Sequence, residues 1–223
     1  SLGAEAIVYA LSPQEAHRFW FIDNTDPDFL KSILESTDPE NTLVYVVSKS
    51  GTTLETIAQF CVVYEWLETK LGSDRARKHF VFCTDPNSGS LRDLANEWKV
   101  PTFEIPTNLG GRFSALCGVG LFPAYLAGIS CDELIAGARH VRSDFLNQIS
   151  KKRVPEIANL AFQLIQNYNE HKRHITVCMP YSQLLKKFTA WFTQLWAESL
   201  GKELKGLTPL AAVGVTDQHS QLQ

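Results

Sequence analysis

A dense group of hydroxyl side chains lies between a short apolar run and an amphipathic segment near residue 50. Residues 48–56 read Ser-Lys-Ser-Gly-Thr-Thr-Leu-Glu-Thr. Hydroxyl groups and the free main-chain N–H groups at a helix start donate hydrogen bonds to anions, and the helix dipole favours negative charge there. We therefore predict a phosphate site at this turn that uses Ser48, Ser50, Thr53 and Thr56.

Two other interpretations of this turn can be compared with the phosphate site. Thr52 and Glu55, three residues later, have the spacing of a capping box. A capping box would use one hydroxyl and leave the other four unexplained. Gly51 is followed by two threonines rather than by Lys and Ser or Thr, so the segment is not a Walker A loop. A small sugar phosphate is therefore favoured over a nucleoside triphosphate.

A second candidate segment has paired glycines beside an arginine, at Gly110, Gly111 and Arg112. Paired glycines let the main chain approach a ligand closely, and a guanidinium supplies a fixed positive charge with several donors. Taken alone, the segment also fits a tight turn with a surface arginine, and that interpretation is the favoured one in isolation.

A third candidate pair, Gln194 and Glu198, lies four residues apart in a helical pattern, so both side chains share one helix face. A carboxylate in this position can act as a base toward a carbon-bound proton. A solvated Glu198 paired with Lys202 fits the spacing equally well.

A lone histidine, His219, lies in the segment Asp217–Gln218–His219–Ser220. Imidazole, with a pKa near ~6.5, suits proton transfer among sugar oxygens. An exposed or structural histidine is the alternative. A hydrolase triad is not supported, because the chain contains no Gly-x-Ser-x-Gly motif.

The amino-acid composition favours a globular protein over a nucleic-acid-binding or membrane protein. The 223 residues are 44% hydrophobic with a net charge of -3, which fits a globular protein and disfavours nucleic-acid binding. The longest apolar run is too short and too broken to span a membrane. Five widely spaced cysteines indicate a reducing, cytoplasmic environment. The nearest approach to metal-ligand spacing, His171 with His174, is interpreted as a solvated helix end, so no metal is expected.

The elements that position these residues alternate strand and helix over the first two thirds of the chain, which predicts an α/β fold with a parallel sheet. Strands are expected over Arg18–Ile22, Thr42–Val47, His79–Cys83, Thr102–Ile105 and His174–Met179. Helices are expected over Pro27–Glu35, Leu54–Leu71, Ser90–Trp98, Cys117–Ala127, Asp132–Ile149, Glu156–His171 and Ser182–Leu200.

A hinge is predicted where the basic residues 151–153 precede Val154 and Pro155. It divides the chain into a first domain, residues 1–150, and the beginning of a second α/β domain, residues 151–223.

The four segments, in this order, resemble the phosphoglucose isomerase family. Its phosphate loop is similar to residues 48–56, its first signature to residues 110–114, and its later landmarks to residues 198–202 and 217–220. The resemblance implies a sugar-isomerase (SIS) domain, a three-layer αβα sandwich around a parallel sheet, followed by the truncated start of a second SIS-type domain.

The resemblance also implies residue roles. Ser48, Lys49, Ser50, Thr53 and Thr56 would hold the sugar phosphate. Glu198 would move a proton between C1 and C2, and Arg112 would stabilise the cis-enediol(ate). Gly111 and Gln194 would line the sugar, and His219 would assist ring opening. The expected reaction is the glycolytic and gluconeogenic interconversion of glucose 6-phosphate and fructose 6-phosphate, with no cofactor.

The resemblance implies a homodimer with a shared active site, in which the histidine comes from the neighbouring subunit. It also implies that these 223 residues are an internal fragment, weakly active or inactive alone, because a further catalytic lysine and an upstream serine of the family lie outside them. A non-catalytic SIS-type sugar-phosphate sensor is the alternative function. An amidotransferase-type isomerase would need a glutaminase domain.

Overall fold

The computed structural model describes residues 2–221. Contacts divide the chain into two compact units. Unit 1 is Glu15–Pro123, and unit 2 combines Leu2–Gln14 with the chain from Ala124 onward. The domain boundary expected after residue 150 stays a prediction.

Unit 1 contains a parallel three-stranded sheet in the order β1-β2-β3. The strands are β1 (Val44–Val47), β2 (Phe80–Thr84) and β3 (Thr102–Glu104). Val47 pairs with Cys83, and Thr84 pairs with Glu104. Every residue of the central strand β2 is buried, as expected for a parallel strand covered on both faces. The predicted α/β class with a parallel sheet is confirmed.

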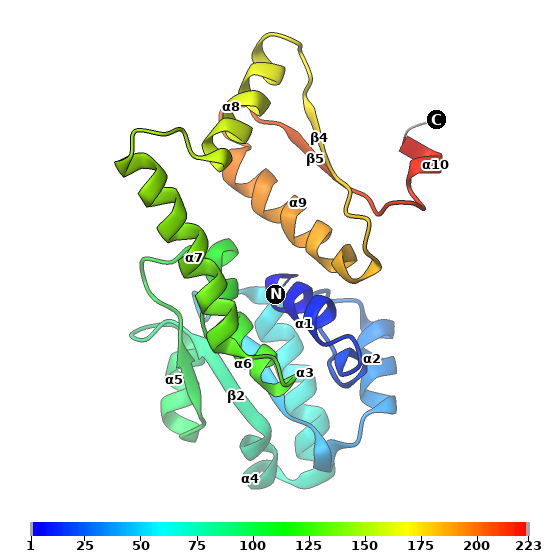
Figure 1. Cartoon of the computed structure of the whole chain (residues 1–223). Coiled ribbons are helices and arrows are strands. Elements are labelled where there is room, and N and C mark those ends of the chain that lie inside the picture. Colours follow the sequence, from blue (N-terminus) through cyan, green and yellow to red (C-terminus); the bar gives the residue numbers. More distant parts are fainter. Residues whose placement is uncertain (1, 222–223) are drawn as a thin grey trace. The chain divides into compact units, whose positions relative to one another are not determined.

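One face of this sheet is covered by α2 (Pro27–Ser36), α3 (Leu54–Leu71) and α5 (Ser90–Trp98) (Figure 1). The buried ring of Phe60 on α3 packs edge-on against the rings of Phe80 and Phe82, at centroid distances of 5.3 and 5.7 Å. Apolar residues of all three helices and of alternating strand positions form this core: Leu30, Val46, Phe60, Val63, Leu67, Phe80, Phe82, Leu91 and Ala95.

The other face packs against α6 (Gly118–Leu126). The rings of Tyr45 and Phe103 each lie 4.8 Å from that of Phe122, and the Tyr45 hydroxyl donates to the main-chain oxygen of Gly118 at 2.8 Å. Unit 1 therefore has the predicted three layers, with helices on both faces of the sheet.

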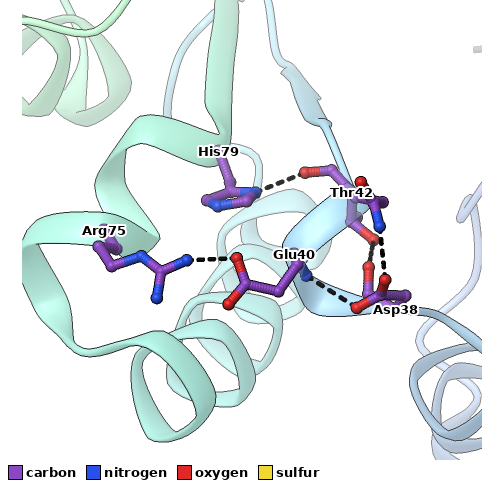
Figure 2. Close-up of polar contacts among 6 residues, drawn as sticks. Asp38, Glu40, Thr42, Arg75 and His79 are labelled. Carbon is purple, nitrogen blue, oxygen red and sulfur yellow. Dashed lines mark hydrogen bonds and ion pairs between the residues drawn. The ribbon is translucent and has the colours of Figure 1, made fainter.

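A polar cluster lies before the amino ends of β1 and β2 (Figure 2). Arg75 forms an ion pair with Glu40, and Nδ1 of His79 lies 2.7 Å from the main-chain oxygen of Thr42. The Asp38 carboxylate accepts from the Glu40 N–H at 3.0 Å. These contacts join the turns that lead into the two strands, at the sheet edge away from the predicted phosphate site.

Unit 2 contains a parallel pair of strands, β4 (Ile175–Cys178) and β5 (Thr208–Ala211), joined through α9 (Lys186–Leu200). On α1, the largely buried carboxylate of Glu5 forms a 2.6 Å ion pair with Lys187 of α9. The remaining helices are α1 (Leu2–Leu11), α7 (Cys131–Ser150), α8 (Glu156–Asn169) and α10 (Gln218–Gln221).

Short helical turns complete the element order. They are η1 (Ala16–Arg18), η2 (Pro39–Asn41), α4 (Ser73–Ala76), η3 (Arg77–His79), η4 (Gly111–Leu116) and η5 (Gln183–Leu185).

One predicted strand is wrong. Residues 18–22 end the 3-10 turn η1 and continue as irregular chain. Phe19 and Phe21 stack on each other with centroids 6.3 Å apart. Alternating aromatic residues are typical of a half-buried extended segment. Such a segment becomes a strand of a sheet only when a neighbouring strand pairs with it. The four-residue strand β5, which contains Pro209, was not predicted from the sequence.

Candidate active-site residues

The three strands of unit 1 end at the same edge of the sheet, because they are parallel. The segments that follow them, residues 48–53, 85–89 and 105–111, therefore meet at this edge. Lys49 joins two of them, since its Nζ donates to the main-chain oxygen of Thr107 at 3.2 Å. The carboxyl edge of a parallel sheet is where α/β folds place their ligand sites.

Thr53 is in contact with two of the other predicted phosphate ligands. The Thr53 hydroxyl lies 2.9 Å from that of Ser48 and 3.4 Å from that of Ser50. Ser48 is buried, whereas Ser50 and Thr53 are exposed. Thr56 lies three residues further along α3, half-buried, at the spacing that shares a helix face with Thr53. The cluster presents hydroxyl donors at the start of an 18-residue helix.

The predicted capping box is wrong. The N-cap of α3 is Thr53, which makes no side-chain capping bond, and the Thr52 hydroxyl instead donates to the Ser50 hydroxyl at 3.1 Å. Gly51 has φ of +68°, and α3 begins at Leu54, directly after its N-cap Thr53. The first turn of α3 therefore lacks the cap that the sequence predicted, and an anion can accept from its N–H groups.

The predicted glycine–arginine segment forms the turn η4. Arg112 is half-buried, with its guanidinium carbon 4.7 Å from the centroid of the Phe113 ring. Gly111 is exposed, and a β-carbon built there would meet no atom within 4 Å. The main chain at Gly111 is therefore open to close approach by a ligand.

The segment after β2 carries a carboxylate that the sequence analysis missed. Asp85 Oδ1 accepts from the N–H groups of Asn87 and Ser88 at 2.8 and 3.1 Å. These main-chain donors, led by Asn87, together with the Ser88 hydroxyl and nearby Lys49, lower the pKa of Asp85 from its ordinary value. The sequence could have pointed to Asp85, because residues 85–89 form a turn between a buried strand and a helix, just as residues 48–53 do.

Beneath this edge lie the buried thiol of Cys83 and the half-buried phenol of Tyr45. Burial is the main cause that raises the pKa of the Cys83 thiol to about 11, and burial likewise raises the pKa of Tyr45. Both groups therefore remain neutral and act as core side chains.

In unit 2, the predicted Gln194 and Glu198 share α9 and are both exposed. The helix ends directly afterwards, where the Gly201 N–H donates to the Ala197 oxygen at 2.8 Å. Lys202 Nζ donates to the main-chain oxygen of Glu198 at 3.1 Å. Glu198 is thus presented from the last turn of the helix.

His219 lies on the four-residue helix α10, in a segment fixed by its neighbours. The Asp217 carboxylate accepts from the Val213 N–H at 2.6 Å, and the Gln218 amide donates to the Tyr181 hydroxyl. Asp217 therefore shapes the loop that carries the exposed imidazole, a role that the sequence analysis did not assign.

The structure does not bring Glu198 and His219 together within unit 2. Because β4 and β5 are parallel, α9 runs back from the carboxyl end of β4 to the amino end of β5. Glu198 is in the last turn of α9, whereas His219 follows the carboxyl end of β5. Figure 1 shows α10 at the end of this strand pair away from the last turn of α9.

Residues 2–221 contain neither a cluster of metal-ligating side chains nor a helix that could span a membrane. No three His, Cys, Asp or Glu side chains in this range gather as metal ligands. Within the same residues, no helix has the length and apolar character needed to cross a bilayer.

Comparison with known proteins identifies relatives over the whole chain. A glucose-6-phosphate isomerase of Carboxydothermus hydrogenoformans is 43% identical over 215 residues, covering 92% of this chain and 45% of the relative. That of Methanocaldococcus jannaschii is 39% identical over 222 residues, covering 100% of this chain and 53% of the relative. The chain spans about half the length of the curated relatives it matches.

Two solved structures are also similar to this chain, in fold as well as in sequence. A crystal structure of a hypothetical protein from Thermus thermophilus aligns with a TM-score of 0.88 at 38% identity, over 100% of this chain and 53% of that one. A glucose-6-phosphate isomerase from Chlamydia trachomatis aligns with a TM-score of 0.85 at 31% identity, over 100% of this chain and 44% of that one. The family model described as phosphoglucose isomerase matches residues 1–213. The chain therefore belongs to the phosphoglucose isomerase family.

Proposed function

We propose that the protein containing this chain interconverts glucose 6-phosphate and fructose 6-phosphate through a cis-enediol(ate). The observation that carries the proposal is the contact of the Ser48, Ser50 and Thr53 hydroxyls at the start of α3, in a chain of this family. Such a cluster suits a phosphate monoester, because each hydroxyl donates without adding a charge.

The phosphate anchors the substrate. Ser48, Ser50, Thr53 and Thr56 donate hydrogen bonds to it, and Lys49 adds positive charge. Lys49 is half-buried, with its ammonium at the Thr107 oxygen, so it lies beside the loop rather than in bulk water. Fixing one end of the sugar holds C1 and C2 at a constant position, which favours reaction over dissociation.

Proton transfer then changes an aldose into a ketose. The Glu198 carboxylate takes the proton from C2 of glucose 6-phosphate and returns it to C1. Arg112 stabilises the negative charge that develops on the enediolate oxygen, and the main chain at Gly111 together with Gln194 lines the sugar. His219 transfers a proton during opening of the pyranose ring.

The active site is shared between two copies in a homodimer. This proposal is supported by the separation of Glu198 and His219 at opposite ends of the β4–α9–β5 segment. The Glu198 carboxylate and a His219 imidazole can act on the same sugar if the imidazole comes from the partner subunit. We also propose a cytoplasmic location, which the five free cysteines support.

The test is Glu198→Gln in the full-length protein. We expect turnover to fall by roughly 10³-fold or more while glucose 6-phosphate still binds, because the lost group acts in the chemical step. Glu203→Gln, the same change at a neighbouring exposed carboxylate, is the matched control and should keep full turnover. A wild-type protein that binds the sugar phosphate but never interconverts it would instead indicate the sensor function.

A further inference from the structure

The segment after β2 lies directly against the predicted phosphate loop. The Asp85 N–H donates to the Lys49 oxygen, and the Leu91 N–H donates to the Gly51 oxygen, both at 3.2 Å. The Ser48 N–H donates to the Cys83 oxygen at 3.0 Å. Three main-chain hydrogen bonds thus fix residues 48–51 against residues 83–91.

Gly89 is the point of closest approach. It has φ of +101°, and a β-carbon built there would lie 2.3 Å from the Ser50 oxygen and 3.2 Å from the α-carbon of Gly51. Gly51 faces it with φ of +68°, and its own β-carbon would lie 3.2 Å from the α-carbon of Gly89. The two glycines leave no room for a side chain between the segments.

The segment that carries Gly89 is itself held in place. Asp85 Oδ1 accepts from Asn87 and Ser88, while the Arg92 Nε donates to the Asp85 oxygen at 2.9 Å. The main-chain oxygen of Gly89 accepts from the N–H groups of Arg92 and Asp93 at 2.8 and 3.1 Å, so the turn is bonded at both ends and an added side chain at Gly89 would press on the phosphate loop.

The buried hydroxyl of Thr84 lies under the same contact. Thr84 is fully buried, and its Oγ1 has no hydrogen-bond partner among the described residues. A β-carbon built at Gly51 would lie 3.1 Å from this Oγ1 atom. A displacement of Gly51 toward β2 is therefore blocked by this side chain.

We propose that Gly89 is a positioning residue for phosphate binding, acting through Ser50 and Gly51. Ser50 transmits the effect, because its hydroxyl accepts from the Thr52 N–H at 3.2 Å and lies 3.4 Å from that of Thr53. A β-carbon at Gly89 requires the Ser50 oxygen to move by about 1 Å to regain ordinary van der Waals contact. That movement separates the hydroxyls that converge on the anion. The inference rests on the proposed phosphate site.

The experiment compares Gly89→Ala with Gly72→Ala in the full-length protein. Gly72 also has a positive φ, +78°, but a β-carbon there meets nothing within 4 Å. Both variants carry backbone strain, and only the first touches the phosphate loop. Binding of inorganic phosphate is measured by calorimetry, kinetics with glucose 6-phosphate by a coupled assay, and stability by thermal melting.

We expect Gly89→Ala to weaken phosphate binding and raise KM by about tenfold or more, with kcat changed much less. Gly72→Ala should lower the melting temperature without changing phosphate binding. Wild-type phosphate affinity in Gly89→Ala, whatever its melting temperature, would overturn the positioning role. A wild-type protein that binds no phosphate would overturn the proposed site itself.

A second variant covers the case in which Gly89→Ala does not fold. Gly51→Ala makes contacts of 3.1 to 3.3 Å with Thr84 and Gly89, so its neighbours need to move by only a few tenths of an ångström. We expect a smaller loss of phosphate affinity, about threefold. Unchanged affinity in Gly51→Ala would then count against the glycine contact.

Discussion

At the scale of single residues, Thr53 has the central place in the hydroxyl cluster. It is the N-cap of α3, and its hydroxyl contacts those of both Ser48 and Ser50. Its neighbour Thr52 is also exposed, and among these hydroxyls its described contact is with Ser50 alone. The two threonines therefore form a natural pair for testing which hydroxyl binds the phosphate.

We expect Thr53→Val to weaken inorganic phosphate binding by about tenfold, because a hydrogen bond to a charged group contributes roughly 1.5–3 kcal/mol. Thr52→Val should weaken it by less than about threefold. Calorimetry on the full-length variants measures both values. Equal losses for the two threonines would mean that the cluster is not arranged around Thr53.

Residue types at this site were largely predictable, whereas their hydrogen bonds were not. The sequence pointed to Ser48, Ser50 and Thr53, and the structure brings their hydroxyls together. It also predicted a capping box at Thr52, but the N-cap of α3 is Thr53, and the Thr52 hydroxyl bonds to that of Ser50 instead. Side-chain spacing alone does not show which of two adjacent threonines is the N-cap.

At the scale of elements, helices were predicted correctly where apolar residues recur at helical spacing. The helix expected over Ser90–Trp98 has those bounds in the structure, and the apolar positions expected from Leu54 to Leu71 all lie on α3, because each helix has an apolar stripe that packs on the sheet. Strand assignments depended on partners that the sequence does not reveal. Arg18–Ile22 lacked one, whereas Thr208–Ala211 pairs with β4 despite its proline.

The burial of β2 leads to a prediction about pH and reactivity. Burial raises the pKa of the Cys83 thiol to about 11 from 9.0, so the folded state favours the neutral form. The stability that this contributes is complete below about pH 9 and is lost as the pH rises through about 11. Native Cys83 should therefore resist iodoacetamide at pH 8.

Cys61 is the internal control, since its thiol is on the exposed side of α3. Mass mapping after alkylation of this chain should show modification of Cys61 first, with Cys83 modified only after denaturant is added. Alkylation of Cys83 as fast as Cys61 in native buffer would contradict the buried, neutral assignment.

At the scale of the whole molecule, the proposed shared site can be tested by mixing two inactive variants. A full-length Glu198→Gln subunit still supplies His219, and a His219→Asn subunit still supplies Glu198. If each site takes these groups from different subunits, a mixed dimer has one intact site. Random mixing then restores about one quarter of wild-type turnover.

The same mixture gives the opposite result if both groups come from one subunit, because every site then carries a lesion. The measurement is turnover after the two variants are unfolded and refolded together, with each variant refolded alone as the control. No recovery above those controls would rule out the shared site while leaving the isomerase proposal intact.

In the proposed reaction, Glu198 moves a carbon-bound proton on a substrate that is anchored by its phosphate. Deuterium exchange from solvent reports this proton transfer. In deuterated water, the wild-type full-length protein should place deuterium at C2 of glucose 6-phosphate, since the abstracted proton exchanges with solvent, and Glu198→Gln should do so no faster than buffer. Wild-type exchange rates in Glu198→Gln would contradict this role of Glu198.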